Sequence, residues 1–227
     1  MLPAARPWSR TAVGVSLLLL AVGCASPRPA PLRLARPDDV RLLTGRSTIR
    51  LRFRDAALVT GQPCLCAAGG FEVVRLALPL LVAPGGRLPA RGEIGLVASR
   101  DHAVADVVAF LLGAVHREDP SRSTRRLDPA LSPRPGTWVF LLVSPGTGRA
   151  ARVTWDRTVL WTEEERRQLA AIEERAERAT PAERQRFRRA MAGLVRAALS
   201  GRGFSVEAAP LDEVLAAYPG LREALAR

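Results

Sequence analysis

The segment AVADVVAFLLGAVH, residues 103–116, repeats apolar side chains at steps of three and four residues. This spacing places them along one face of an α-helix. The apolar positions are Val104, Val107, Val108, Leu111, Leu112 and Val115. Asp101 stands just ahead of the segment, where its carboxylate can accept a backbone N–H that the first turn leaves unpaired. We therefore expect a core helix that Asp101 caps and that ends near His116.

The sequence on both sides of this helix shows patterns typical of strands. The clearest example is the alternation of Ile49, Leu51 and Phe53 with arginines. Two apolar runs on either side of the turn sequence PGTG, residues 145–148, predict a hairpin. The full set of expected strands is 49–53 with a continuation at 57–60, 71–82, 93–98, 138–143, 151–155, 158–161 and 204–207.

The last third of the chain contains two helix start signals of the capping-box type, in which two side chains bond each other's backbone N–H. The first is Thr162 with Glu165, and the second is Thr180 with Glu183, followed by a proline at the first helical position. The expected helices cover 163–179, 181–200 and 211–217, the last broken at Pro219-Gly220.

These elements predict one α+β domain over residues 38–227. We expect an antiparallel or mixed sheet, one central helix and a helical C-terminal third. Residues 118–136 show no period, so they are expected to form a long loop. A hydrophobic content of 48% with 25% charged residues is typical of a globular chain.

Residues 1–24 have the pattern of an export signal. Arg6 and Arg10 precede an apolar run over 11–22, and Gly23 stands before Cys24. The run of about 12 residues is too short to cross a hydrocarbon core of about 30 Å, so it indicates a cleaved signal rather than an anchor. Its end, LAVGC, resembles the lipobox of bacterial lipoproteins. The resemblance implies that residues 1–23 are a signal peptide and that Cys24 is acylated, whereas an ordinary secretory signal cut nearby is the alternative.

Residues 24–37 are rich in proline and arginine and predict an extended tether behind the acylated cysteine. The expected partner of Cys24 is the lipid bilayer. In a cell with two membranes, Ala25 rather than an aspartate after the cysteine implies passage to the outer one, so the expected location is the outer membrane of the bacterial cell envelope, facing the periplasm.

The chain carries a formal net charge of +12, and its basic residues are all arginine. Such an excess is often a sign of polyanionic partners. An exported protein meets little nucleic acid, however, and no known nucleic-acid-binding motif is present. We therefore expect no nucleic-acid partner.

Cys64-Leu65-Cys66 is the one chemically suggestive pair, and we expect it in a turn closed by Gly69-Gly70. In an oxidising compartment the two cysteines are predicted to form a disulfide. Free or intermolecular thiols, or a soft metal such as Cu(I), are the alternatives. A metal site needs more ligands, and the two histidines, His102 and His116, lie too far apart on one helix to share an ion.

Positive charge is concentrated on the second of the two long C-terminal helices. Arg184, Arg188 and Arg189 are expected to contact an anionic partner such as a phospholipid headgroup. A purely solvated helix face is the alternative.

No catalytic residue, metal site or cofactor is assigned from the sequence. The favoured function is a membrane-anchored envelope lipoprotein with a non-catalytic structural or interaction role. The alternatives are an accessory lipoprotein for envelope transport or assembly that binds lipid or glycan, and a thiol- or metal-handling protein or enzyme that uses Cys64 and Cys66. A deep apolar pocket would favour the former. His102 or His116 within about 4 Å of the cysteine sulfurs would favour the latter.

Overall fold

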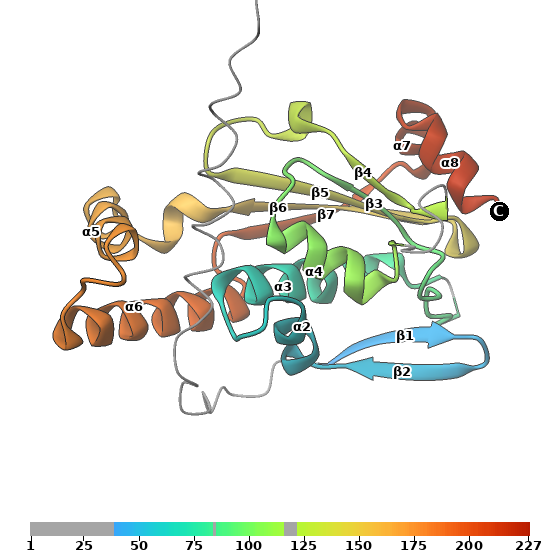
Figure 1. The fold of residues 1–227 in the computed structure, drawn as a ribbon. Coiled ribbons are helices and arrows are strands. Elements are labelled where there is room, and N and C mark those ends of the chain that lie inside the picture. The colour runs from blue at the N-terminus through green and yellow to red at the C-terminus, as the bar shows by residue number, and fades with distance from the viewer. Residues whose placement is uncertain (1–38, 84, 116–121) are drawn as a thin grey trace, which may run out of the picture.

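The computed structural model describes residues 39–83, 85–115 and 122–227. The predicted signal peptide, Cys24, the predicted tether and His116 lie outside these ranges. The described residues form an α+β fold, as predicted, with a five-stranded mixed sheet and a separate two-stranded antiparallel hairpin (Figure 1).

The large sheet has the strand order β4-β3-β5-β6-β7. Its strands are β3 (Gly95–Ala98), β4 (Arg125–Leu127), β5 (Thr137–Ser144), β6 (Arg149–Asp156) and β7 (Phe204–Ala209). All neighbours are antiparallel except β3 and β4, which run parallel. The predicted hairpin is confirmed: β5 and β6 pair along their full length, and a 3₁₀ turn, η3 (Pro145–Thr147), joins them.

The small hairpin consists of β1 (Val40–Thr44) and β2 (Ser47–Leu51). The strand predicted from the alternation at residues 49–53 is therefore confirmed through Leu51. Its continuation at 57–60 is wrong, because residues 53–59 form helix α2 (Phe53–Val59). Asp55 accepts the Arg52 backbone N–H at 2.7 Å, which stabilises the start of that helix.

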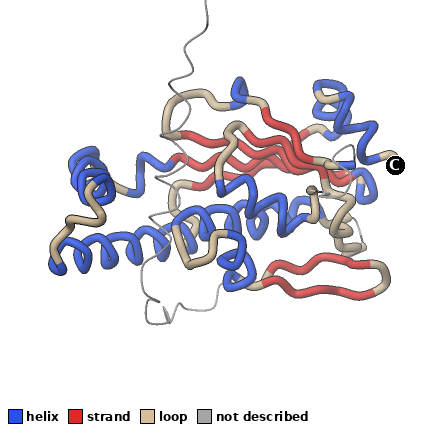
Figure 2. Tube along the Cα trace, viewed as in Figure 1, coloured by secondary structure: helices blue, strands red, loops and turns tan. Residues whose placement is uncertain are grey.

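Helices cover both faces of the large sheet (Figures 1 and 2). Helix α3 (Leu65–Leu81) and helix α4 (Ala103–Leu112) pack on one face, within the main core. Helices α7 (Leu211–Ala217) and α8 (Pro219–Leu225) lie on the opposite face, where Val214, Leu215 and Leu221 join a second apolar cluster.

Helix α4 is the core helix that its period predicts, but its start differs from the prediction. His102 occupies the N-cap position without a side-chain cap bond. Asp101 instead accepts a hydrogen bond at 2.8 Å from Arg125, which lies on β4. The helix ends at Leu112 and not near His116, because Gly113 adopts the left-handed conformation that terminates helices.

Residues 65–81 form helix α3, whereas their sequence predicts a turn over residues 64–70 and a strand over 71–82. Side chains on nearly every side of this helix are buried, so its apolar residues show no helical period. Gly69 and Gly70 lie inside the helix and close no turn. Their missing side chains let the helix backbone approach Trp155 and Val107 more closely than a Cβ would allow.

Three further predictions need correction. Residues 158–161 are no strand, because η4 (Arg157–Leu160) is a 3₁₀ turn that Asp156 caps through the Thr158 N–H at 3.0 Å. Part of the expected loop at 118–136 is regular, since it contains β4 and the 3₁₀ turn η2 (Pro129–Leu131). Pro219 begins α8 instead of ending the helical region.

The two predicted capping boxes are present. Thr162 with Glu165 starts α5 (Glu163–Glu174), and Thr180 with Glu183 starts α6 (Pro181–Leu199). Helix α5 is shorter than predicted, so residues 175–180 link the two helices. Helix α6 contacts α3 and extends beyond the sheet (Figure 1). Within the described ranges, no helix has the length and apolar character to cross a bilayer.

The packing of α3 gives a stability test with a matched control. We expect Gly69→Ala to lower the free energy of unfolding by about 2 kcal/mol, because the new methyl group overlaps the Trp155 ring. Gly193→Ala, also inside a helix, meets nothing within 4 Å and should raise it by up to about 1 kcal/mol. Urea unfolding followed by circular dichroism measures both. Equal stability of Gly69→Ala and the parent chain would contradict the proposed close packing.

Candidate thiol site at the start of helix α3

Cys64 and Cys66 lie at the N-terminal end of α3. Cys64 is the N-cap residue, and its sulfur accepts the Ala67 backbone N–H at 3.4 Å. Cys66 follows in the first turn, and both residues are half-buried free thiols. A helix N-terminus favours negative charge, so the position of Cys64 favours a thiolate.

The two thiols share a proton unequally. The pKa of Cys64 is lowered to about 6, chiefly because the Cys66 thiol hydrogen-bonds to its sulfur. Burial opposes this shift, whereas hydrogen bonds from Thr60 and from the Ala67 backbone support it. The pKa of Cys66 is raised by the same hydrogen bond, by burial and by the negative charge of Cys64. Near pH 7 the pair is therefore a thiolate at Cys64 and a thiol at Cys66.

His102 brings an imidazole to this pair from the start of α4. Its Nδ1 lies 3.7 Å from the Cys66 sulfur, and its ring packs on Trp138 with the ring centroids 4.8 Å apart. Burial and the nearby Arg157 charge lower the pKa of His102, although Asp106 and Asp101 oppose this shift. The imidazole is therefore neutral near pH 7 and can exchange a proton with Cys66.

Arg157 places a fixed positive charge beside the thiols. Its guanidinium carbon lies 4.3 Å from the Trp138 ring centroid and 5.5 Å from those of Trp155 and Trp161. Its buried Nε has no hydrogen-bond partner among the described residues. Burial lowers the pKa of Arg157, and the Cys66 sulfur opposes that shift, so guanidinium and thiol interact electrostatically. The positive charge in turn favours a thiolate at the pair.

The structure thus brings together the cysteine pair and one of the two candidate histidines. The distance of 3.7 Å between His102 Nδ1 and the Cys66 sulfur is within the range that we expected for a thiol-based function. Sequence reasoning missed Arg157 and Trp138, which no motif marks. Asp106 accepts a hydrogen bond from Arg125 at 2.6 Å.

The disulfide predicted between Cys64 and Cys66 stays a prediction, and so does the alternative of a bound soft metal. In the described part of the chain, no three His, Cys, Asp or Glu side chains are grouped so that they could hold a metal ion. The adjacent Arg157 charge also disfavours a cation at the two sulfurs.

The arginines predicted to bind anions all lie on α6. Arg184 donates a hydrogen bond to the Ala179 carbonyl just ahead of the helix. Arg188 and Arg189 are exposed on the same helix. The structure identifies no ligand for them.

The chain was compared with protein-family models, curated proteins and solved structures, and none of them matches it. Functional interpretation therefore rests on the geometry of the site.

The lowered Cys64 pKa predicts a specific reactivity. Alkylation of Cys64 by iodoacetamide should rise through about pH 6, because the thiolate is the nucleophile. Cys66→Ala removes the main stabilising hydrogen bond and should move this rise to higher pH, whereas Arg188→Gln on α6 should leave it unchanged. Mass spectrometry of the labelled peptide measures the rate at each pH. A rise near pH 8.5, the value of an ordinary cysteine, would contradict the assigned thiolate.

Proposed function

We propose that this chain is an exported, lipid-anchored protein whose Cys64–Cys66 pair donates its disulfide to dithiol substrates. The observation that carries the proposal is the 3.7 Å contact between His102 Nδ1 and the Cys66 sulfur, beside a cysteine at a helix N-terminus. It favours the thiol alternative over the non-catalytic structural role that the sequence alone suggested. The proposed location, the outer membrane facing the periplasm, is a compartment in which disulfides persist.

The direction of transfer follows from the pKa of Cys64. The hydrogen bonds that lower it to about 6 stabilise the reduced form of the pair, in which Cys64 is a thiolate. A stabilised reduced form makes the corresponding disulfide more oxidising. The pair is therefore suited to accept two electrons rather than to supply them.

The first step breaks the Cys64–Cys66 bond. A substrate thiol loses its proton to His102, and the resulting thiolate attacks the Cys64 sulfur to form a mixed disulfide. Cys66 leaves with the electron pair of the broken bond. It then takes the proton from His102, whose Nδ1 lies within reach at 3.7 Å. Burial, which raises the pKa of Cys66, still favours its protonated form in the mixed disulfide, and this slows its attack on that bond.

The second step releases the oxidised substrate. The second substrate thiol loses its proton to solvent and attacks the substrate sulfur that is bound to Cys64. Cys64 leaves as a thiolate, and its low pKa makes it a good leaving group. In sum, the substrate dithiol becomes a disulfide, and the pair becomes one thiolate and one thiol. Re-oxidation takes the same steps in reverse with a disulfide of higher reduction potential.

A transfer experiment tests this mechanism. The oxidised chain should convert a reduced peptide dithiol to its disulfide at pH 7 faster than an equal concentration of glutathione disulfide, as followed by chromatography. Cys64→Ser should abolish transfer. His102→Gln should slow transfer. The effect should be largest at pH values below the pKa of the substrate thiol, where deprotonation of that thiol limits its attack. Arg188→Gln is the matched surface control and should have no effect.

Two results would refute the proposed thiol chemistry. One is that oxidants never produce an intramolecular Cys64–Cys66 disulfide, as judged by mass spectrometry. The other is that Cys64→Ser transfers as fast as the parent chain. A rate that His102→Gln leaves unchanged at every pH would remove the histidine from the mechanism.

The proposed anchor has its own test. Labelled palmitate should enter the parent chain and not Cys24→Ala, because the cysteine after Gly23 is the acceptor in a lipobox-type signal. A single acyl chain binds membranes only marginally, so firm anchoring requires the several chains that the resemblance to bacterial lipoproteins implies. Equal labelling of both proteins would show that Cys24 is not acylated.

A further inference from the structure

A groove lies between α5 and α6, outside the thiol site. It encloses about 310 Å³, near the lower limit of pockets that hold small molecules. Its apolar lining includes Leu160 of η4, Trp161 directly after it, and Leu169, Ile172, Leu194 and Ala197 of α5 and α6. These side chains give the groove an apolar floor that an acyl chain could cover.

Small residues on α6 keep the groove open. Ala190, Gly193 and Ala197 all line it, and they follow one another at three- and four-residue steps along one helix face. Gly193 is notable because a helix interior disfavours glycine. A Cβ at this position would meet nothing within 4 Å, so no contact of the fold requires the glycine. Its effect is to leave space in the groove.

The rim of the groove carries more positive than negative charge. Its charged lining residues are Arg186, Arg202 and Glu165. The Glu165 carboxylate is engaged by the capping box, where it accepts the Thr162 backbone N–H at 2.7 Å. Both arginines are exposed, so they can contact a ligand at the rim.

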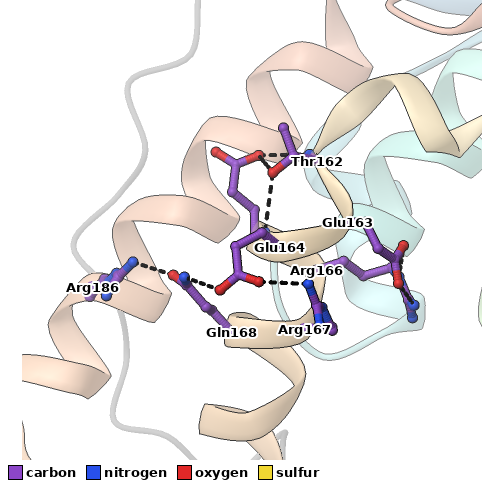
Figure 3. A network of polar contacts seen from close by, with 8 residues as sticks. Thr162, Glu163, Glu164, Arg166, Arg167, Gln168 and Arg186 are labelled. Atoms are coloured by element: carbon purple, nitrogen blue, oxygen red, sulfur yellow. Dashed lines mark hydrogen bonds and ion pairs between the residues drawn. The ribbon is translucent and has the colours of Figure 1, made fainter.

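Two successive hydrogen bonds link Arg186 on α6 to Gln168 and Glu164 on α5. The guanidinium donates to the Gln168 side-chain oxygen at 2.5 Å, and the Gln168 amide donates to Glu164 at 2.6 Å (Figure 3). The partner of Arg186 in this bond is a neutral amide, so its positive charge is not neutralised there. Arg186 is thus positioned at the rim with its charge available to an anion.

We propose that this groove binds a fatty acid, with the acyl chain on the apolar floor and the carboxylate at Arg186 and Arg202. An apolar floor below two arginines is complementary to an amphipathic anion. The volume of about 310 Å³ fits one medium-length chain and is too small for a two-chain phospholipid. The site differs from the surface of Arg184, Arg188 and Arg189 that the sequence analysis suggested, because only Arg186 and Arg202 line the groove.

Calorimetric titration with dodecanoate, below the concentration at which it forms micelles, tests this site. The protein is the full chain carrying Cys24→Ala, so that no acyl chain of its own competes. Saturable binding of one dodecanoate is expected. Gly193→Leu fills open space and should weaken binding by about tenfold or more, while circular dichroism shows an intact fold. Arg186→Gln combined with Arg202→Gln should weaken it by about tenfold through loss of the charged contacts.

Matched controls separate the groove from general surface adsorption. Arg188→Gln, on the same helix but outside the groove, should bind like the parent chain. Dodecyltrimethylammonium, with the same chain and a cationic head, should not bind. Cys64→Ser should bind normally, so failure of the thiol mechanism and failure of the groove are independent results.

Three outcomes would overturn the groove site. The first is no saturable binding of dodecanoate. The second is unchanged affinity of Gly193→Leu with an intact fold. The third is an equal loss for Arg188→Gln and for the paired rim variant, which would indicate attraction to the basic helix surface as a whole.

Discussion

Helix α3 places its bare backbone against the indole ring of Trp155, because residue 69 has no side chain to separate them. On its other side, residue 70 allows the same close approach to Val107 of α4, where a Cβ would lie 2.6 Å from a valine methyl carbon. These two contacts fix the helix between the sheet and α4. Close packing of this kind fixes the position of the helix, because a dense interior leaves little room for a helix to shift.

The thiol site depends on this arrangement. Cys64 and Cys66 are carried by α3, His102 by the start of α4, and Arg157 by the turn that follows β6. The aromatic rings beneath them form a continuous layer, in which Trp155 stacks on Phe204 with the ring planes 9° apart and meets Trp138 edge-on. This layer holds Arg157 in a partly desolvated position, where its charge acts on the cysteine pair more strongly than it would in water.

The aromatic layer also borders the proposed fatty-acid groove. The Trp161 ring centroid lies 5.5 Å from the Arg157 guanidinium carbon, and the same side chain lines the groove between α5 and α6. Trp161 therefore lies beside both Arg157 of the thiol site and the groove, although the proposals made for the two sites are independent. Both suit the membrane-surface location that we propose for the chain, where acyl chains are abundant.

Local sequence determined the elements whose stability comes from their own residues. The capping boxes at Thr162 and Thr180, the β5–β6 hairpin and helix α4, with its apolar residues at three- and four-residue steps, all follow from short-range patterns, and the structure contains them. Only the tertiary structure decided that residues 65–81 are helical, since burial on nearly every side removes the period that would reveal the helix. It also decided the contact of Cys66 with His102, which are 36 residues apart in the chain. No local pattern encodes that contact, because it exists only where α3 and α4 pack together, with Gly70 against Val107.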